Sequence, residues 1–166
     1  MDVANGPGIR VSMFISGCNF HCPDCFNQEA QDFNYGKLYT VDTESHLLEH
    51  IAKPHVKGLS ILGGDPLWQD LIGLAQLIEL CDKVHKIPSK NVWLWTGFVW
   101  EQIWDKSKNT QEDILRRLLV SCCDVIVDGL YDKNLKDHSL KWKGSSNQRV
   151  IDVVKSYSAQ EVVLYE

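Results

Sequence analysis

The feature that most constrains the fold of this chain is a set of four short runs of apolar and β-branched residues. A glycine follows each run within two residues. The runs cover residues 9–16, 58–62, 92–95 and 123–127, and two further strands are expected over residues 149–154 and 161–165. Helical spacing of apolar residues predicts helices over residues 42–53, with Asp42 as the N-cap, and over residues 69–85, 99–104 and 112–120. This alternation predicts an α/β protein with a parallel sheet and right-handed crossovers.

The turns that follow the four strands are expected to lie together. They comprise residues 17–27, residues 63–66, the pair Thr96 and Gly97, and the pair Asp128 and Gly129. The carboxyl ends of parallel strands meet at one edge of a sheet, and ligands collect at that edge. The sequence therefore predicts a binding site built from these turns.

Composition narrows the class of protein. The chain has 166 residues, of which 44% are hydrophobic and 23% charged, as expected for a globular protein with one domain over residues 1–166. A net charge of −5 without a basic stripe argues against nucleic acid as a partner. No apolar run approaches the roughly 20 residues of a membrane span. Because the first residues lack the basic and apolar blocks of a signal peptide, we expect a cytoplasmic protein without a membrane partner.

Three of the six cysteines crowd into one turn with the spacing Cys18-x3-Cys22-x2-Cys25. In a reducing compartment such crowding indicates a metal site. A structural zinc site would need a fourth ligand, from His21 or a remote cysteine. A 4Fe-4S cluster can be held by three cysteines in a short loop, which leaves one iron open to a ligand that is also a substrate. The spacing favours the cluster, and zinc stays an alternative. The other three cysteines are predicted to be buried small hydrophobes: Cys81, Cys122 and Cys123.

The order of the motifs resembles a known family. The cysteine triplet after the first strand, followed by Gly-Gly-Asp-Pro after the second, is similar to the radical S-adenosylmethionine superfamily. Within it, the chain resembles the activating proteins of anaerobic ribonucleoside-triphosphate reductase. This narrower resemblance rests on further motifs: NGPG at residues 5–8, WLWTG at 93–97, VDG at 127–129 and LKWKGSSNQ at 140–148. The chain begins close to the first of these, so a few N-terminal residues that relatives carry are expected to be absent.

The resemblance implies which residues bind the cofactors. Cys18, Cys22 and Cys25 would ligate a 4Fe-4S cluster, and S-adenosylmethionine would chelate the fourth iron. A turn would receive the methionyl amino group, its glycines allowing a close approach of backbone to ligand. That turn consists of Gly63, Gly64, Asp65 and Pro66.

Two residues that flank the last cysteine would lie against the bound cofactor. They are Asp24 and Phe26. The superfamily commonly has an aromatic residue just before its third cysteine, whereas this chain has Asp24 there and an aromatic residue just after. The activating-protein branch shares the later position, usually with tyrosine, which makes Phe26 the candidate for stacking on adenine.

The resemblance also implies a fold, a reaction and partners. The fold would be a partial parallel βα barrel of radical S-adenosylmethionine type, because the chain is too short for a full barrel of about 250 residues. The cluster would cleave S-adenosylmethionine reductively, and the 5′-deoxyadenosyl radical would take hydrogen from a glycine of the reductase large subunit, without a catalytic side chain. A one-electron donor such as flavodoxin or ferredoxin would be needed.

Alternative functions stay open. The chain could be an activase of another glycyl-radical enzyme, a radical enzyme acting on a small molecule, or a non-enzymatic electron-transfer or zinc-binding module.

Other conspicuous residues receive more ordinary predictions. Core packing is expected for Trp93, Trp95, Trp100 and Trp104, and interface positions are expected for Trp68 and Trp142. His21 is predicted to be a solvated spacer. Three residues are candidates to touch cofactor or partner: Asp128, Ser145 and Asn147.

Overall fold

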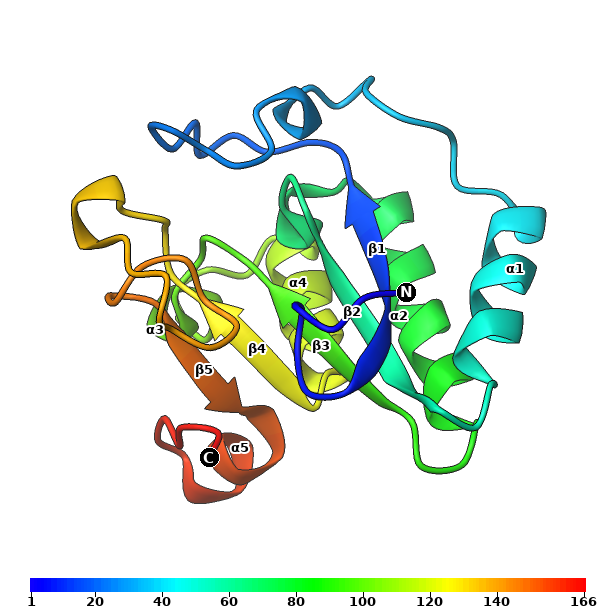
Figure 1. The fold of residues 1–166 in the computed structure, drawn as a ribbon. Coiled ribbons are helices and arrows are strands. Elements are labelled where there is room, and N and C mark those ends of the chain that lie inside the picture. The colour runs from blue at the N-terminus through cyan, green and yellow to red at the C-terminus, as the bar shows by residue number, and fades with distance from the viewer.

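A five-stranded sheet forms the centre of the molecule in the computed structural model, which describes all of residues 1–166 (Figure 1). The strands are β1 (Ile9–Ile15), β2 (Val56–Gly63), β3 (Asn91–Trp95), β4 (Val125–Asp128) and β5 (Arg149–Asp152), and they neighbour one another in that order. β1 to β4 are parallel, whereas β5 runs antiparallel to β4. The predicted α/β class is confirmed, and the sheet is open rather than closed into a barrel.

The helices connect the strands and cover one face of the sheet. They are α1 (Val41–Ile51), α2 (Leu71–His85), α3 (Trp100–Ile103), α4 (Gln111–Ser121) and α5 (Val153–Ala159), with short 3-10 turns η1 (Glu29–Gln31), η2 (Pro66–Trp68) and η3 (Lys133–Leu135). In Figure 1, α2 and α4 lie behind the sheet, and α1 lies beside α2 at the right-hand edge. Apolar residues from these helices and from the strands form one cluster of 21 buried residues. None of the helices is long and apolar enough to span a bilayer.

Two helices begin at residues other than those expected. Thr40, not Asp42, caps α1, because its Oγ1 accepts a hydrogen bond from the Thr43 backbone N–H at 3.2 Å. Asp70 caps α2 in the same way, through the Gly73 N–H at 2.7 Å, so this helix starts after Gln69. In both cases the first short polar side chain that reaches the N3 amide ends the irregular segment.

The antiparallel β5 corrects the expectation of an all-parallel sheet. Residues 129–148 contain only η3, and a parallel return would require a crossover connection, usually a helix. β5 ends at Asp152, whose side chain caps α5. The strand expected over residues 161–165 is wrong, because that segment makes only an isolated bridge between Leu164 and Ile151.

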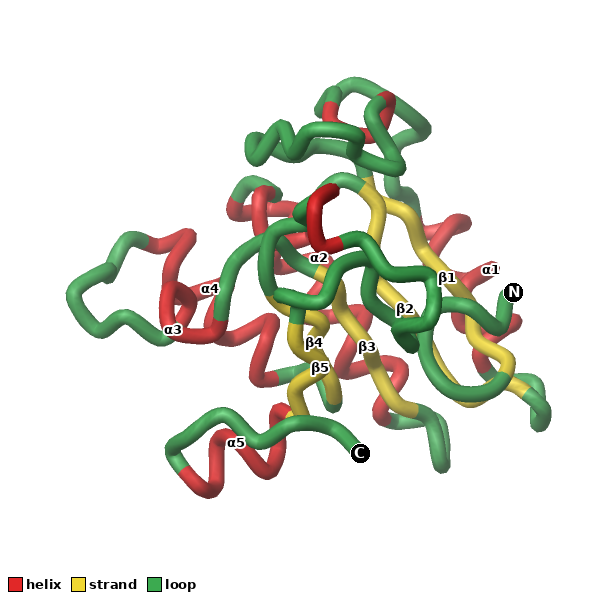
Figure 2. The backbone as a smooth tube through the Cα atoms, turned by 60° about the vertical axis from the view of Figure 1, so that its left-hand side comes forward, coloured by secondary structure: helices red, strands yellow, loops and turns green.

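Loops rather than helices cover the other face of the sheet. Arg10 is fully buried there and donates to Ser60 Oγ and Asn91 Oδ1, each at 2.7 Å. Its guanidinium lies 5.5 Å from the ring centroid of Trp93, and burial lowers the pKa of Arg10 to about 10. The long segment after β1 arches over the carboxyl end of the sheet, mostly as loop (green in Figure 2). The sheet thus has one apolar face under helices and one polar and aromatic face under loops.

Candidate metal centre

The cysteine loop is anchored at the carboxyl end of β1. Its first residue, Gly17, donates its N–H to the Ala30 carbonyl at 2.7 Å, which closes the loop at its base. The turn after β2 is bonded to the same base, because Asp65 N–H donates to the Gly17 carbonyl at 2.9 Å and Gly64 N–H to the Ile15 carbonyl at 2.6 Å. The predicted meeting of these two turns is confirmed.

The two glycines of this turn allow the close approach of two backbones. Gly63 has a φ of +123°, and a Cβ there would lie 2.3 Å from the Ile15 carbonyl oxygen. A Cβ on Gly64 would lie 2.6 Å from the Gly17 carbonyl oxygen. Real Cβ atoms do not approach so closely. The end of β1 and the start of the cysteine loop can therefore lie this close to the turn only because residues 63 and 64 are glycines. Contact of these glycines with a cofactor stays a prediction.

Asp65 ties the turn after β2 to the turn after β3. Its carboxylate is 1% exposed and accepts hydrogen bonds from Thr96 Oγ1 at 2.9 Å, Gly97 N–H at 2.7 Å and Leu67 N–H at 2.8 Å. Burial raises the pKa of Asp65 to about 6, and these hydrogen bonds oppose that rise. The side chain is therefore committed to holding these two turns together.

The three loop thiols influence one another. Cys18 is buried, and Cys22 and Cys25 are half-buried. The pKa of Cys18 is raised to about 11, chiefly by burial and also by the charges of Asp65, Cys22 and Cys25, against a hydrogen bond from the Phe20 backbone. Burial also raises the pKa of Cys22, against a hydrogen bond from the Tyr131 backbone. A bound cation would be needed to hold Cys18 and Cys22 as thiolates near neutral pH.

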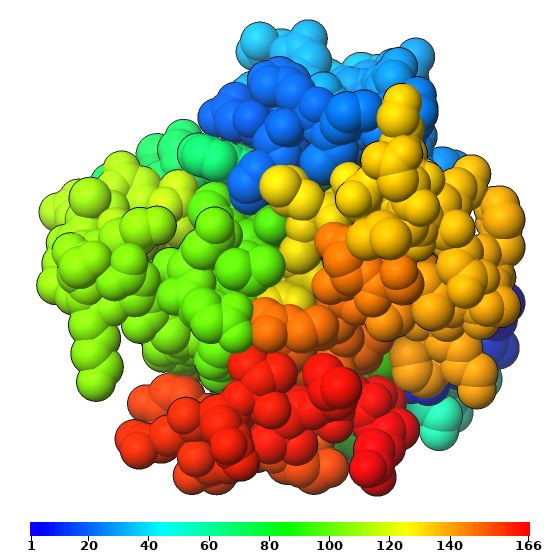
Figure 3. Space-filling view, turned by 90° about the vertical axis from the view of Figure 1, so that its left-hand side faces the viewer, coloured from blue at the N-terminus to red at the C-terminus, as the bar shows by residue number.

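The segment after β4 adjoins the cysteine loop. Besides the Tyr131 contact to Cys22, Lys133 Nζ on η3 lies 3.4 Å from Asp24 Oδ2. Figure 3 shows the two segments side by side, the cysteine loop in blue and the residues after β4 in yellow. The cysteine loop is therefore bonded to the turn after β2 and contacts the segment after β4, and Asp65 links these to the turn after β3.

The spacing of the sulfurs bears on which metal group they fit. In zinc sites the Zn–S bond is about 2.3 Å, so two sulfurs on one ion lie at most about 4.6 Å apart. The loop cysteines are not a set whose ligand atoms all lie within 4.8 Å of one another. His21 does not complete such a set, since it is exposed and its Nδ1 lies 3.1 Å from Gln31 Oε1, as expected of a solvated spacer. The loop sulfurs as placed are therefore not a ready site for one tetrahedral ion.

The residues that flank Cys25 point away from the protein core. Asp24 has a φ of 56° and makes the ion pair with Lys133. Phe26 is 93% exposed, so its ring is open to any ligand or partner at this edge. Asn27, which the sequence analysis did not single out, donates from Nδ2 to the Gly63 carbonyl at 3.4 Å. Its position two residues after the last cysteine was the only signal for it.

An aromatic cluster lies beside the cysteine loop. Phe20 packs edge-on against Trp68 and Phe98, with ring centroids 5.5 and 4.9 Å apart, and Arg116 stacks over Trp68 at 5.4 Å. Trp68, which was expected at an interface, is half-buried and packs on these rings, and a partner contact for it stays a prediction. Trp142 is likewise packed, against Trp93 at 5.1 Å.

The three other candidates for cofactor or partner contact all have partners within the chain. Ser145 is buried and its Oγ accepts from Asp132 N–H at 3.1 Å, while Asn147 Nδ2 donates to the Leu130 carbonyl at 2.8 Å. Asp128 is buried and binds Arg149, which raises the pKa of that arginine. Their side chains fasten the segment after β4, and a ligand contact for them stays a prediction.

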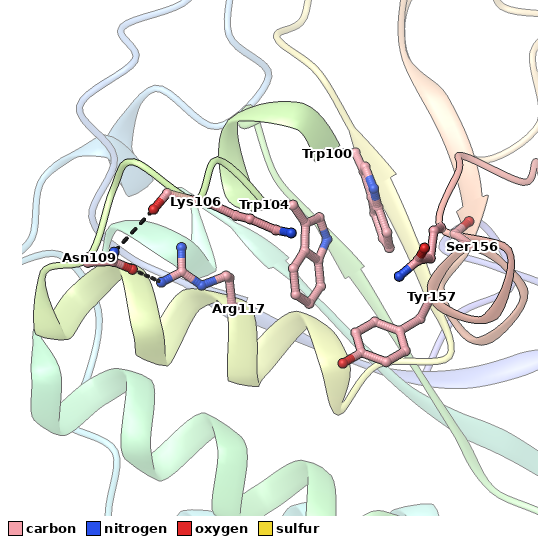
Figure 4. Close-up of a pocket in the computed structure, with 8 residues that line it drawn as sticks. Trp100, Trp104, Lys106, Asn109, Arg117, Ser156 and Tyr157 are labelled. Atoms are coloured by element: carbon pink, nitrogen blue, oxygen red, sulfur yellow. Dashed lines mark hydrogen bonds between the residues drawn. The ribbon is translucent and has the colours of Figure 1, made fainter.

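A pocket of about 790 Å³ lies away from this edge, among α3, α4 and α5 (Figure 4). Its walls include Trp104, Arg117 and Tyr157, and none of the predicted site residues lines it. The candidate centre is therefore a surface constellation of loops rather than this hollow.

Comparison with known proteins agrees with the cysteine constellation. A family model described as "4Fe-4S single cluster domain" matches residues 4–151, which defines the chain as an iron–sulfur protein of the single-cluster class. An activating protein of anaerobic ribonucleoside-triphosphate reductase from Enterobacteria phage T4 is 37% identical over 150 residues, covering 90% of this chain and 87% of the relative. The proteins of the same name from Escherichia coli K12 and Salmonella typhi are each 33% identical over 153 residues, covering 90% of this chain and 92% of each relative.

The chain belongs to the family of anaerobic ribonucleoside-triphosphate reductase-activating proteins. The resemblance found in its motifs is thereby confirmed, and the 4Fe-4S family supports an iron–sulfur cluster over zinc. No solved structure gives a significant match.

Proposed function

We propose that this chain is an activating enzyme of the radical S-adenosylmethionine class that acts on the large subunit of anaerobic ribonucleoside-triphosphate reductase. The observation that carries the proposal is the cysteine triplet at the carboxyl edge of a parallel sheet, bonded at its base to the Gly-Gly-Asp-Pro turn. Family membership supplies the target, because the relatives are named as activators of that reductase.

In this proposal the loop cysteines Cys18, Cys22 and Cys25 hold a 4Fe-4S cluster whose fourth iron has no protein ligand. When bound, these cofactors would supply a 5′-deoxyadenosyl radical, formed with methionine as one electron passes from the cluster to S-adenosylmethionine, and this radical would remove hydrogen from a glycine of the reductase. The chain needs no general base for that step. Its tasks are to bind the cofactors, orient them and exclude water.

Residues around the loop are suited to those tasks. The backbone of Gly63, Gly64 and Pro66 would receive the methionyl amino group, and Asp65 would keep that turn in place through its bonds to the turn after β3. Asp65 is thus a positioning residue. The exposed ring of Phe26 is available to stack on adenine, beside Asp24. The aromatic cluster of Phe20, Trp68 and Phe98 presents a water-excluding wall next to the loop.

The proposal extends to the architecture and to the partners. The open sheet would correspond to the partial barrel of a radical S-adenosylmethionine protein, with residues 1–166 as one domain. An exposed cysteine loop suits a reaction on the backbone of another protein, since the reductase glycine must reach the cofactor. Electrons would come from a donor such as flavodoxin or ferredoxin in the cytoplasm.

The direct test is anaerobic reconstitution with iron and sulfide, followed by dithionite and S-adenosylmethionine. We expect 5′-deoxyadenosine, measured by mass, and a glycyl radical detected by electron paramagnetic resonance when the reductase is added. Protein with an intact cluster that gives neither product, alone or with reductase, would instead be an electron-transfer module. Product without a radical on this reductase would point to another glycyl-radical enzyme or to a small-molecule substrate.

A further inference from the structure

Helix α1 brings two histidines and a glutamate together on its surface. Their metal-ligating atoms all lie within 4.8 Å of one another, and no other three metal-ligating side chains in the chain meet that condition. The residues are His46, Glu49 and His50. Positions three and four apart on a helix share one face, so the α-helical backbone itself sets this grouping. His46 and Glu49 are exposed and His50 is half-buried, which leaves the group accessible from solvent.

The hydrogen bonding of His50 leaves one ring nitrogen free for a metal. Its Nδ1 lies 2.9 Å from the His46 backbone carbonyl oxygen. A carbonyl oxygen only accepts, so Nδ1 is the donor in this hydrogen bond and Nε2 is the nitrogen left for a metal. This is the arrangement in which metal-binding histidines are commonly fixed, with the second nitrogen donating to a carbonyl or carboxylate.

The carboxylate of the group is also free of competing partners. Glu49 takes part in no ion pair and no side-chain hydrogen bond, whereas Glu44 on the same helix is paired with Lys83. The rings of His46 and His50 lie 4.3 Å apart between centroids and are tilted by 55°, so they converge without stacking flat. Two imidazoles and one unpaired carboxylate therefore lie close enough together to share one ion.

We propose that α1 carries a binding site for a divalent transition metal, separate from the cysteine loop, formed by His46, Glu49 and His50. Two nitrogens and one oxygen suit Zn²⁺, Ni²⁺ or Cu²⁺, whereas Mg²⁺ and Ca²⁺ prefer oxygen ligands alone. Three protein ligands leave a coordination position for water. In Figure 1, α1 lies at the right-hand edge of the molecule, while the cysteine loop extends to the left of β1.

The site has two consequences for the protein. Only Ile51 of α1 is fully buried, so a metal that clamps residues one turn apart would stabilise a helix with few core contacts. Zinc found in the purified protein would also not identify the cysteine loop as a zinc site, because α1 offers a second place for it. The two metal centres must therefore be assigned with separate variants.

The test is an anaerobic calorimetric titration of Zn²⁺ into the protein with its iron–sulfur cluster assembled, so that the loop thiols are occupied. We expect one equivalent of Zn²⁺ to bind and the midpoint of thermal unfolding to rise. Both effects should be lost in the double variant His46→Gln with His50→Gln, and Glu49→Gln should weaken binding about tenfold or more. His138→Gln, which replaces an exposed histidine elsewhere, should leave binding unchanged.

Two results would overturn the proposal: an unaltered equivalent of zinc in the double variant with native circular dichroism, or no binding by the parent protein. Repeating the titration with Cys18, Cys22 and Cys25 all replaced by serine separates this site from the proposed cluster. Zinc should still bind to α1 in that variant, whatever the outcome of the activity assays.

Discussion

The chain holds two sets of three cysteines, and they occupy opposite environments. The loop trio of Cys18, Cys22 and Cys25 lies in irregular backbone at the carboxyl edge of the sheet, next to solvent. The core trio lies on α2 and just after α4, with two members at 0% and 2% exposure. Its members are Cys81, Cys122 and Cys123. The prediction that these three are packed as small hydrophobes is confirmed for Cys81 and Cys123, and Cys122 is half-buried.

Backbone context explains why the same side chain differs so much between the two sets. In the core, Cys123 Sγ donates to the Leu119 carbonyl one helical turn away at 3.3 Å, and the neighbouring Cys81 thiol together with burial raises the pKa of Cys123. Such thiols stay protonated and act as apolar filling. In the loop, residues with positive φ such as His21 and Asp24 turn the chain so that three thiols face a common region. Metal capacity thus arises from the turn rather than from the number of cysteines.

Replacing a loop cysteine should have the largest effect. Cys22→Ala is expected to abolish cluster assembly and 5′-deoxyadenosine formation, because only three protein ligands are available. Its circular dichroism should stay native, since this half-buried side chain contributes little to the core. Iron and sulfide analysis with the product assay measures the effect. Continued product formation under strong reductant would show that the ligand assignment is wrong.

Replacing Asp65 should show how much the contacts at the carboxyl edge of the sheet contribute to the free energy of unfolding. Asp65→Ala leaves Thr96 Oγ1, Gly97 N–H and Leu67 N–H without their buried acceptor, and we expect a loss of about 3 kcal/mol or more in the free energy of unfolding. Urea denaturation measures this loss. Asp70→Ala, which removes an exposed helix cap, is the matched control and should cost about 1 kcal/mol. Equal effects of the two substitutions would mean that Asp65 does not hold the edge together.

Replacing a core cysteine should lower the free energy of unfolding but leave the iron content unchanged. Cys81→Ala creates a small cavity, with an expected loss of about 1 kcal/mol, and the iron content should stay at the parental level. Both quantities can be measured on one preparation by urea unfolding and metal analysis. A fall in iron without unfolding would break the distinction between the two sets.

The smallest effect is expected for the ion pair between the cysteine loop and η3. Lys133→Ala removes a contact of 3.4 Å between two side chains that are each more than half exposed. Exposed pairs contribute little, so the free energy of unfolding should stay within about 0.5 kcal/mol of the parent value. A loss several times larger would indicate that the loop depends on η3 for its place.

Local sequence patterns were enough to predict the parallel part of the fold and the meeting of the turns. Each strand is an apolar run, and the parallel arrangement then brings the loop of Cys18 to the turn of Gly64 without further information. The metal-ligating group on α1 also had a local signal, the H-x2-E-H spacing within the helix predicted over residues 42–53. No local pattern predicts that β5 runs antiparallel. Its direction follows from the absence of a crossover helix in residues 129–148.

The remaining features depend on contacts between residues far apart in the chain. Asp65 accepts a hydrogen bond from Thr96, which is 31 residues further along the chain. Arg10 donates to Asn91 across a separation of 81 residues. Trp68 follows a turn, and its packing against Phe20 and Phe98 from other segments could not be predicted from its sequence neighbours. Spacing within a segment cannot report such partners, since they are set by how the sheet and loops pack.

The proposed function requires that the loop trio holds a 4Fe-4S cluster with one iron open to S-adenosylmethionine. Low-temperature electron paramagnetic resonance of the reduced protein, recorded with and without S-adenosylmethionine, tests it most directly. The account predicts one reduced cluster per chain whose signal changes when S-adenosylmethionine is added, in the parent and in Cys81→Ala alike. A signal that S-adenosylmethionine leaves unchanged, or zinc bound at the loop cysteines in the double histidine variant, would contradict it.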